Sequence, residues 1–159
     1  MRYLAGLVHK SPSLASRIWI ASFTPEDVTA VIAMRAEEPA LENISIGGLF
    51  EDVDGHYMVE DAAAVYSAMG FNFLSVKENM VTAELILACH EKGLAVFCWV
   101  TNSEEVCERL LGMDIDGFCG DDMDLLLKYQ LKSDAGRSQP PVLVVAPISQ
   151  DGGAASSGN

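Results

Sequence analysis

Residues 93–124, GLAVFCWVTNSEEVCERLLGMDIDGFCGDDMD, contain two apolar runs that each end in polar or acidic residues. Trp99 and Asn102 close the first run, and Asp121 follows the second. A Trp beside an Asn could form an apolar wall and a polar anchor for a hydroxylated ligand. The same spacing also has a structural interpretation, in which Trp99 belongs to the core of the sheet and Asn102 caps the next helix. From spacing alone we favour the structural interpretation.

Two acidic clusters could bind a hard cation, because such cations take several oxygen ligands. They are EDVD at 51–54 and DDMD at 121–124. The second cluster stands at a predicted helix N-terminus, where the helix dipole favours acids whatever their function. Neither cluster has an ordered ligand spacing, so we expect no metal site in this chain.

Five strand-like runs position these residues, at 17–23, 43–50, 71–76, 94–100 and 115–120, with helices between them. The interior runs are continuously apolar, which is typical of parallel strands buried on both faces. The predicted class is therefore α/β, built from parallel βα repeats. In such proteins ligands gather where strands end and helices begin. The candidate site residues by this rule are Ser22, Phe23, Gly48, Lys77, Glu78, Trp99, Asn102 and Asp121.

The predicted helices are bounded by capping residues and glycines. We expect Thr24 and Thr82 to cap the helices that follow them, because a hydroxyl oxygen can accept an N–H of the first turn. Gly70, Gly93 and Gly112 each stand just past a predicted helix, where a left-handed residue turns the chain toward the next strand.

Composition limits the classes of partner. The 159 residues include 23 acids and 10 bases, for a net charge of −13, which argues against nucleic acid or an anionic membrane as the main partner. The cysteines are expected to be buried reduced thiols. No run resembles a secretory signal or a transmembrane segment. We therefore expect a reducing, cytoplasmic compartment, provided that Met1 is the true start.

The segment GLAVFCWVTN, followed after a helix by GMDIDGFCGD, resembles the end of the glycerophosphodiester phosphodiesterase family. That family typically has a strand ending in Trp-Thr-Val-Asn, a helix, and then Gly-Val-Asp-Gly-Ile-x-Thr-Asp. WIASFTPEDV resembles its Ser-Phe-Asp-Pro turn, and VTAELILACHEKGLAV resembles its helix before the Trp strand. The order and spacing agree over about residues 17–127.

The resemblance implies a (β/α)8 TIM barrel of which this chain holds the last five strands, since a full barrel takes roughly 250 residues. For the complete domain it implies a glycerophosphodiester substrate, a divalent metal (Mg or Ca) and two catalytic histidines in the first part of the barrel. One histidine belongs to a His-Arg-Gly turn and the other to a His-Asp pair, and neither motif occurs here. His9, His56 and His90 have other neighbours, and we give them no catalytic role.

By the resemblance, Phe23 and Trp99 would line the substrate pocket. Ser22, Asn102 and Asp121 would support the strand ends around them. No catalytic residue and no metal ligand is carried over to this chain. The implied site is therefore one wall of a pocket whose chemistry lies in another part of the barrel.

We divide the chain into a lead-in at 1–16, a partial barrel at 17–132 and a linker with a small-residue tail at 133–159. Within the last part, PVLVVAPIS is a short apolar run bracketed by prolines. It could add an edge strand to the sheet or bind a partner. We favour an element that packs on the domain surface or stays mobile.

Three functional interpretations follow. The first is the C-terminal portion of a glycerophosphodiester phosphodiesterase, inactive as an isolated chain because the catalytic histidines and metal ligands are absent from it. The second is a non-catalytic binding or oligomerisation module, because open sheet edges need a second copy or a partner to cover them. The third, a nucleotide-binding domain, is weak because no GxGxxG or GxxxxGK loop follows a strand. We favour the first.

Overall fold

The computed structural model describes residues 2–51, 59–134 and 142–145 of the chain. These residues form one parallel sheet of six strands in the order β1-β2-β3-β4-β5-β6. The strands are β1 Trp19–Ser22, β2 Ser45–Phe50, β3 Phe73–Lys77, β4 Ala95–Trp99, β5 Gly117–Gly120 and β6 Val142–Val145. The α-helices are α1 Arg2–Lys10, α2 Pro25–Glu37, α3 Val59–Ala68, α4 Ala83–Glu91, α5 Glu104–Gly112 and α6 Met123–Asp134. Short 3-10 turns are η1 Pro12–Arg17, η2 Pro39–Leu41 and η3 Glu78–Met80.

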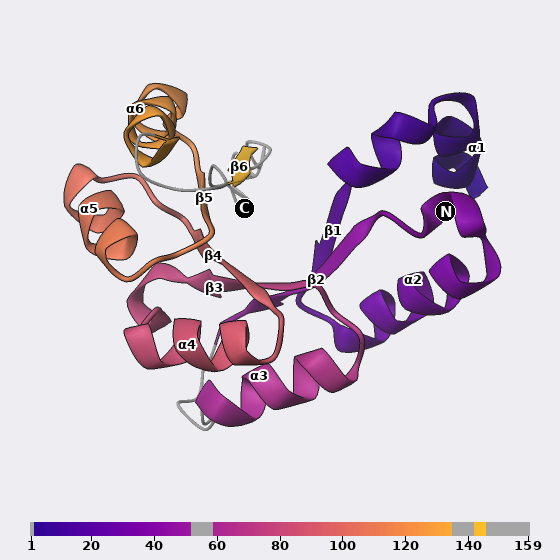
Figure 1. Cartoon of the computed structure of the whole chain (residues 1–159), viewed down its shortest axis with the longest axis horizontal. Helices are drawn as coiled ribbons and strands as arrows, with labels where there is room; N and C mark the ends of the chain where they lie inside the picture. The colour runs from indigo at the N-terminus through magenta and orange to yellow at the C-terminus, as the bar shows by residue number, and fades with distance from the viewer. Residues whose placement is uncertain (1, 52–58, 135–141, 146–159) are drawn as a thin grey trace, which may run out of the picture.

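The predicted fold class is confirmed. Strands β1 to β5 alternate with helices, and each pairs in parallel with its neighbour along the chain. Figure 1 shows the sheet curling, with the helices following its outer side. The result is a curled half-barrel in which the carboxyl ends of the strands meet along one rim.

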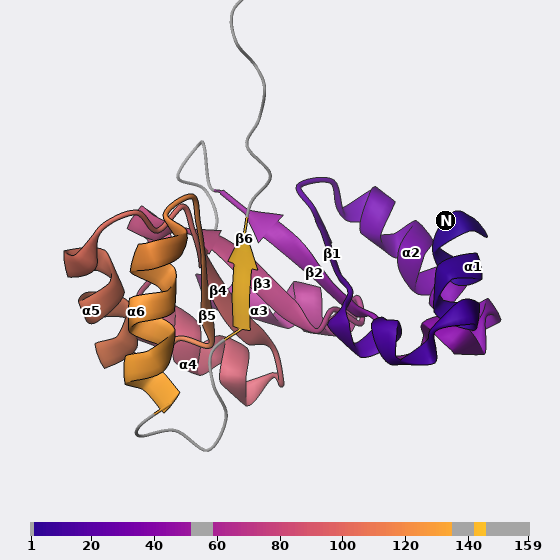
Figure 2. The same cartoon turned by 90° about the horizontal axis from the view of Figure 1, so that it is seen from above.

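Strand β6 corrects the prediction for the apolar run near the C-terminus. We favoured a surface-packed or mobile element, whereas β6 pairs in parallel with β5, with Gly117 opposite Val142 and Gly120 opposite Val145. Figure 2 shows β6 lying alongside β5. The edge strand that we held as an alternative is therefore the one formed, because the exposed ladder of β5 offers hydrogen bonds to any extended segment within reach.

The two faces of the sheet differ in what covers them. Under the helices, the strand side chains are sealed from solvent, with 0% exposure for Ile46, Leu74, Val76, Val96 and Cys98. The concave face carries an aromatic cluster, in which the ring centroids of Trp19, Phe73 and Phe97 lie 5.0 to 5.3 Å apart. A Cβ at Gly47 would run into the Phe73 ring, so glycine at this position makes room for the cluster.

Helix ends follow the sequence in part. Thr82 caps α4, its hydroxyl accepting the N–H of Leu85 at 3.1 Å, as predicted. Thr24 occupies the N-cap position of α2, but its side chain makes no capping hydrogen bond, so that prediction is wrong. The reason is that the Ser22 hydroxyl, which bonds both the N–H of Thr24 and the carboxylate of Asp27, already ties this turn together.

The turn glycines were also predicted in part. Gly70 and Gly93 have positive φ angles of 82° and 74°, as expected. Gly112 does not, because it is still the last residue of α5 and the left-handed position falls on Asp114, at φ 65°. Asp is one of the few residues other than glycine that tolerate this conformation.

Candidate functional site

An aromatic pair joins the carboxyl ends of β1 and β4. The rings of Phe23 and Trp99 meet edge to face, with centroids 5.5 Å apart at 83°. The Trp99 ring is fixed, because its Nε1 donates a hydrogen bond of 2.9 Å to the carbonyl of Ser75. Phe23 is 57% exposed, so one side of the aromatic pair faces solvent.

Asn102 and Asp121 join the carboxyl ends of β4 and β5. Asn102 Nδ2 donates to Asp121 Oδ2 at 3.0 Å, and the N–H of Asp121 donates back to Asn102 Oδ1 at 2.9 Å. Asn102 does not cap α5, since Ser103 does so through its hydroxyl, and our structural interpretation of Asn102 is therefore wrong. A Cβ at Gly120 would strike the carbonyl oxygen of Thr101, so the two segments can approach this closely only because residue 120 is glycine.

Ser22 stands apart from these pairs. Its hydroxyl donates to Asp27 Oδ2 at 3.3 Å and accepts from the N–H of Thr24 at 3.1 Å. Thr24 lies in the turn between β1 and α2, and Asp27 lies in the first turn of α2. Ser22 thus holds together the turn that carries Phe23.

Lys77, the last residue of β3, lies beside Trp99 because the two residues are register partners. Its ammonium group forms an ion pair with Glu51, just past the end of β2. Lys77 and Trp99 also line one surface hollow together with Glu78, Asn79 and Val100. The sequence predicts Lys77 and Glu78 as candidate site residues. It does not predict the ion pair of Lys77 with Glu51, because the two residues are 26 positions apart and no local sequence pattern connects them.

The remaining candidates for chemistry are engaged elsewhere. Glu78 accepts a hydrogen bond of 2.8 Å from Arg109 Nη2. His9 pairs with Glu38, and His90 lies 2.8 Å from Asp116 at the opposite ends of the strands. His56 and residues 52–54 of the EDVD cluster fall outside the described residues.

The described residues do not fit a divalent metal. Within residues 2–51, 59–134 and 142–145 no group of three His, Cys, Asp or Glu side chains is arranged to hold an ion. In the DDMD cluster, Asp121 bonds Asn102, and Asp122 Oδ1 accepts the N–H of Leu125 at 3.0 Å at the start of α6. These carboxylates are thus occupied in holding the turn.

The cysteines are free thiols, as predicted, and Cys89, Cys98 and Cys107 are buried, while Cys119 is half-buried. Burial raises the pKa of the Cys89 and Cys98 thiols to about 11, since an apolar site disfavours the thiolate. Protonated, enclosed thiols are poor nucleophiles and poor metal ligands. These side chains therefore act as core residues.

A curled parallel sheet whose strands alternate with helices places the chain in the class of βα-barrel proteins, of which it forms a part. A sequence model of the glycerophosphoryl diester phosphodiesterase family matches residues 4–125. The chain belongs to that family. The match ends at the start of α6, so β6 lies outside it.

Solved structures that are similar to this chain include the following two. One is a candidate glycerophosphodiester phosphodiesterase of Galdieria sulphuraria, at 26% identity and a TM-score of 0.61, covering 80% of this chain and 49% of its own. The other is a candidate glycerophosphoryl diester phosphodiesterase of Silicibacter pomeroyi, at 20% identity and a TM-score of 0.55, covering 72% of this chain and 38% of its own. This chain thus spans less than half the length of either neighbour. A comparison with curated protein sequences returned no match.

In the part of the chain that the structure describes, no helix has both the length and the apolar character needed to cross a bilayer.

Proposed function

We propose that this chain is the C-terminal portion of a glycerophosphodiester phosphodiesterase and that it supplies one wall of the substrate pocket. The observation that carries the proposal is the contact of Phe23 with Trp99 at the carboxyl rim, where barrel proteins bind their ligands. Phe23 and Trp99 act as the wall. Ser22, Asn102 and Asp121 support it through the turn and strand-end hydrogen bonds described above.

The complete protein would hydrolyse a glycerophosphodiester to a free alcohol and glycerol 3-phosphate. A divalent metal, Mg or Ca, would supply Lewis acidity there, and two histidines would move the protons. The sequence of this chain has neither the His-Arg-Gly turn nor the His-Asp pair of the family, and its described residues do not fit a metal. We therefore assign binding and positioning to the residues of this chain, and we propose that the isolated chain is inactive.

Hydrolysis of glycerophosphocholine by purified 1–159, with Mg or Ca added, tests the inactivity. We expect no metal-dependent release of choline above the rate without protein. Release that depends on metal and disappears with chelator would overturn the inactivity. The mass of the endogenous polypeptide tests the rest of the proposal, since we expect a product well above the 17.1 kDa of this sequence, carrying the histidine motifs.

The alternative is a binding or oligomerisation module derived from the barrel. It is favoured by one observation, namely that β1 pairs with β2 and with no other strand among the described residues. A free parallel edge invites a further strand from a second copy or a partner. Light scattering of the purified chain, combined with hydrogen exchange of the β1 amides, tests it. A monomer whose β1 amides are protected would count against the module.

A further inference from the structure

The carboxyl rim of the half-barrel is short of positive charge. Among the described residues within three positions of the carboxyl ends of β1 to β5, Lys77 is the only lysine or arginine. The chain as a whole carries a net charge of −13, so an anion approaching this rim meets a repulsive field. A phosphate ester can be held here only where a local cation outweighs that field.

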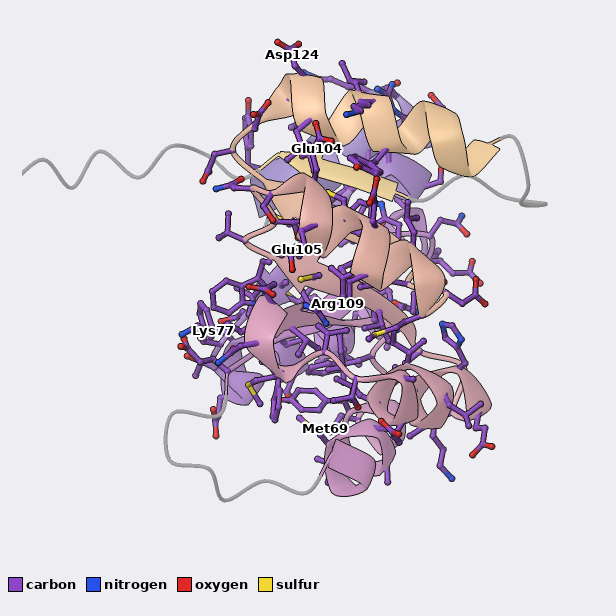
Figure 3. The ribbon with its side chains drawn as sticks, turned by 90° about the vertical axis from the view of Figure 1, so that its left-hand side faces the viewer. Met69, Lys77, Glu104, Glu105, Arg109 and Asp124 are labelled. Carbon is purple, nitrogen blue, oxygen red and sulfur yellow. The ribbon has the colours of Figure 1, made fainter. Side chains whose placement is uncertain are left out.

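Lys77 has the position that such a cation needs. It ends β3 opposite Trp99 in register, and both side chains line the same hollow. Figure 3 shows Lys77 at the margin of the molecule, apart from the acidic side chains Glu104, Glu105 and Asp124 of the neighbouring helices. Arg109, the other cation in the region, is held by the carboxylate of Glu78 at 2.8 Å and by two carbonyl oxygens.

The present partner of Lys77 is exchangeable. The Lys77 side chain is 44% exposed and that of Glu51 is 28% exposed, and an ion pair so open to water is weak. A phosphate group can replace Glu51 as the partner, because carboxylate and phosphate oxygens both form charge-assisted hydrogen bonds with an ammonium group. Glu51 thus keeps Lys77 neutralised and oriented at the rim without binding it firmly.

We propose that Lys77 is an anion-binding residue, which takes the phosphate of a glycerol phosphate ester in the hollow it shares with Trp99 and exchanges Glu51 for it. This inference rests on the proposed function, which supplies the substrate class. The inference adds the positively charged side chain of Lys77 to the pocket wall, for which the family resemblance implies only the aromatic residues Phe23 and Trp99. It assigns Lys77 to binding, with no part in the chemical step.

The test is an NMR titration of the labelled chain with sn-glycerol 3-phosphate, with glycerol and sodium phosphate in separate runs. Lysine side-chain signals report on Lys77, and the two tryptophan indoles give a built-in comparison. When the phosphate ester is added, we expect the side-chain signal of Lys77 and the indole signal of Trp99 to shift together. The indole signal of Trp19, which lies inside the aromatic cluster of the concave face, should not shift.

Three variants make the assignment specific. Lys77→Met should weaken binding by about tenfold, the usual loss for a hydrogen bond to a charged group. Glu51→Gln should tighten it by about threefold, because the competing carboxylate is removed. Lys92→Met, at the C-cap of α4 and away from the rim, should change nothing. A thermal melt of each variant controls for folding.

Opposite effects of Lys77→Met and Glu51→Gln support anion binding. If both variants weaken binding equally, or neither alters it, the pair is structural and the proposal is overturned. A shift of the Trp99 indole with no effect of Lys77→Met overturns it too, while leaving the pocket wall in place. The parent function has separate readouts, in hydrolysis and in polypeptide mass, so the two can fail independently.

Discussion

The two ends of the strands are built differently. At the amino ends, side chains bind the backbone of neighbouring strands: Asn72 Oδ1 accepts the N–H of Ile46 at 2.9 Å, and Asp116 Oδ2 accepts that of Val96 at 2.7 Å. At the carboxyl ends, side chains mostly bind one another. The pairs there are Lys77 with Glu51, Phe23 with Trp99 and Asn102 with Asp121.

This difference separates stability from function within one sheet. A side chain bonded to a strand N–H fixes the ladder, and its loss leaves a buried donor without a partner. A pair of partly exposed side chains can part and bind a ligand at little cost to the fold. Barrel proteins show the same division between a stabilising amino face and a functional carboxyl face.

The largest effect that separates the two ends is expected from Asn72→Ala. It removes the acceptor for the N–H of Ile46, a fully buried residue, and for Arg35 Nη1 at 3.0 Å. We expect a loss of about 2–3 kcal/mol in the free energy of unfolding, measured by urea titration. Asn79→Ala, at the exposed turn after β3, is the matched control and should cost under about 0.5 kcal/mol. Equal losses for the two would erase the distinction.

Asp116→Ala should have the next largest effect, a loss of about 2 kcal/mol in the free energy of unfolding. The reason is that the N–H of Val96 and the ring of His90 both lose their partner. Asp116→Asn keeps one acceptor oxygen and should lose about half as much. Urea titration of both variants in parallel measures this grading. If Asn were as damaging as Ala, the charge and not the hydrogen bond to the ladder would be what matters.

These amino-end contacts show where sequence analysis stops. The five strands β1 to β5 could be predicted because continuous apolar runs between helix caps are a local signal. Asn72 and Asp116 gave none, because each binds a residue 20 or more positions away. The sequence analysis does not favour strand β6 for the same reason, since the pairing of β6 depends on the open edge of β5 and not on the composition of β6 itself.

The candidate site was predictable to a similar degree. Phe23, Trp99, Asn102 and Asp121 could be named from the ends of strands, and the structure brings them together in two pairs. Which residues pair could not be named, because pairing is set by strand register and by the closeness that Gly120 permits. Asn102 was read as a helix cap on local grounds, while its partner lies 19 positions away.

Asp121→Ala, at the carboxyl end, should cost about 1 kcal/mol. One hydrogen bond to Asn102 Nδ2 is lost, but the N–H of residue 121 still reaches Asn102 Oδ1. Asp124→Ala in the first turn of α6 is the control, with a cost of about 0.3 kcal/mol from the helix dipole. If Asp121→Ala lowered the free energy of unfolding as much as Asn72→Ala, the carboxyl ends of the strands would stabilise the sheet as strongly as the amino ends. That result would contradict the difference between the two ends.

Phe23→Ala should have the smallest effect on stability and the clearest local one. Phe23 is 57% exposed and touches Trp99 by an edge, so its removal exposes little new apolar surface and should cost about 0.5 kcal/mol or less. The indole resonance of Trp99 should move, because the ring current of Phe23 is gone, while that of Trp19 should not. Leu87→Ala, equally exposed on α4 at 60%, matches the loss of apolar area without touching either tryptophan.

A loss above about 2 kcal/mol in the free energy of unfolding for Phe23→Ala would mean that the aromatic pair belongs to the core. The carboxyl rim would then be as structural as the amino end, and the ligand wall would have to be sought elsewhere.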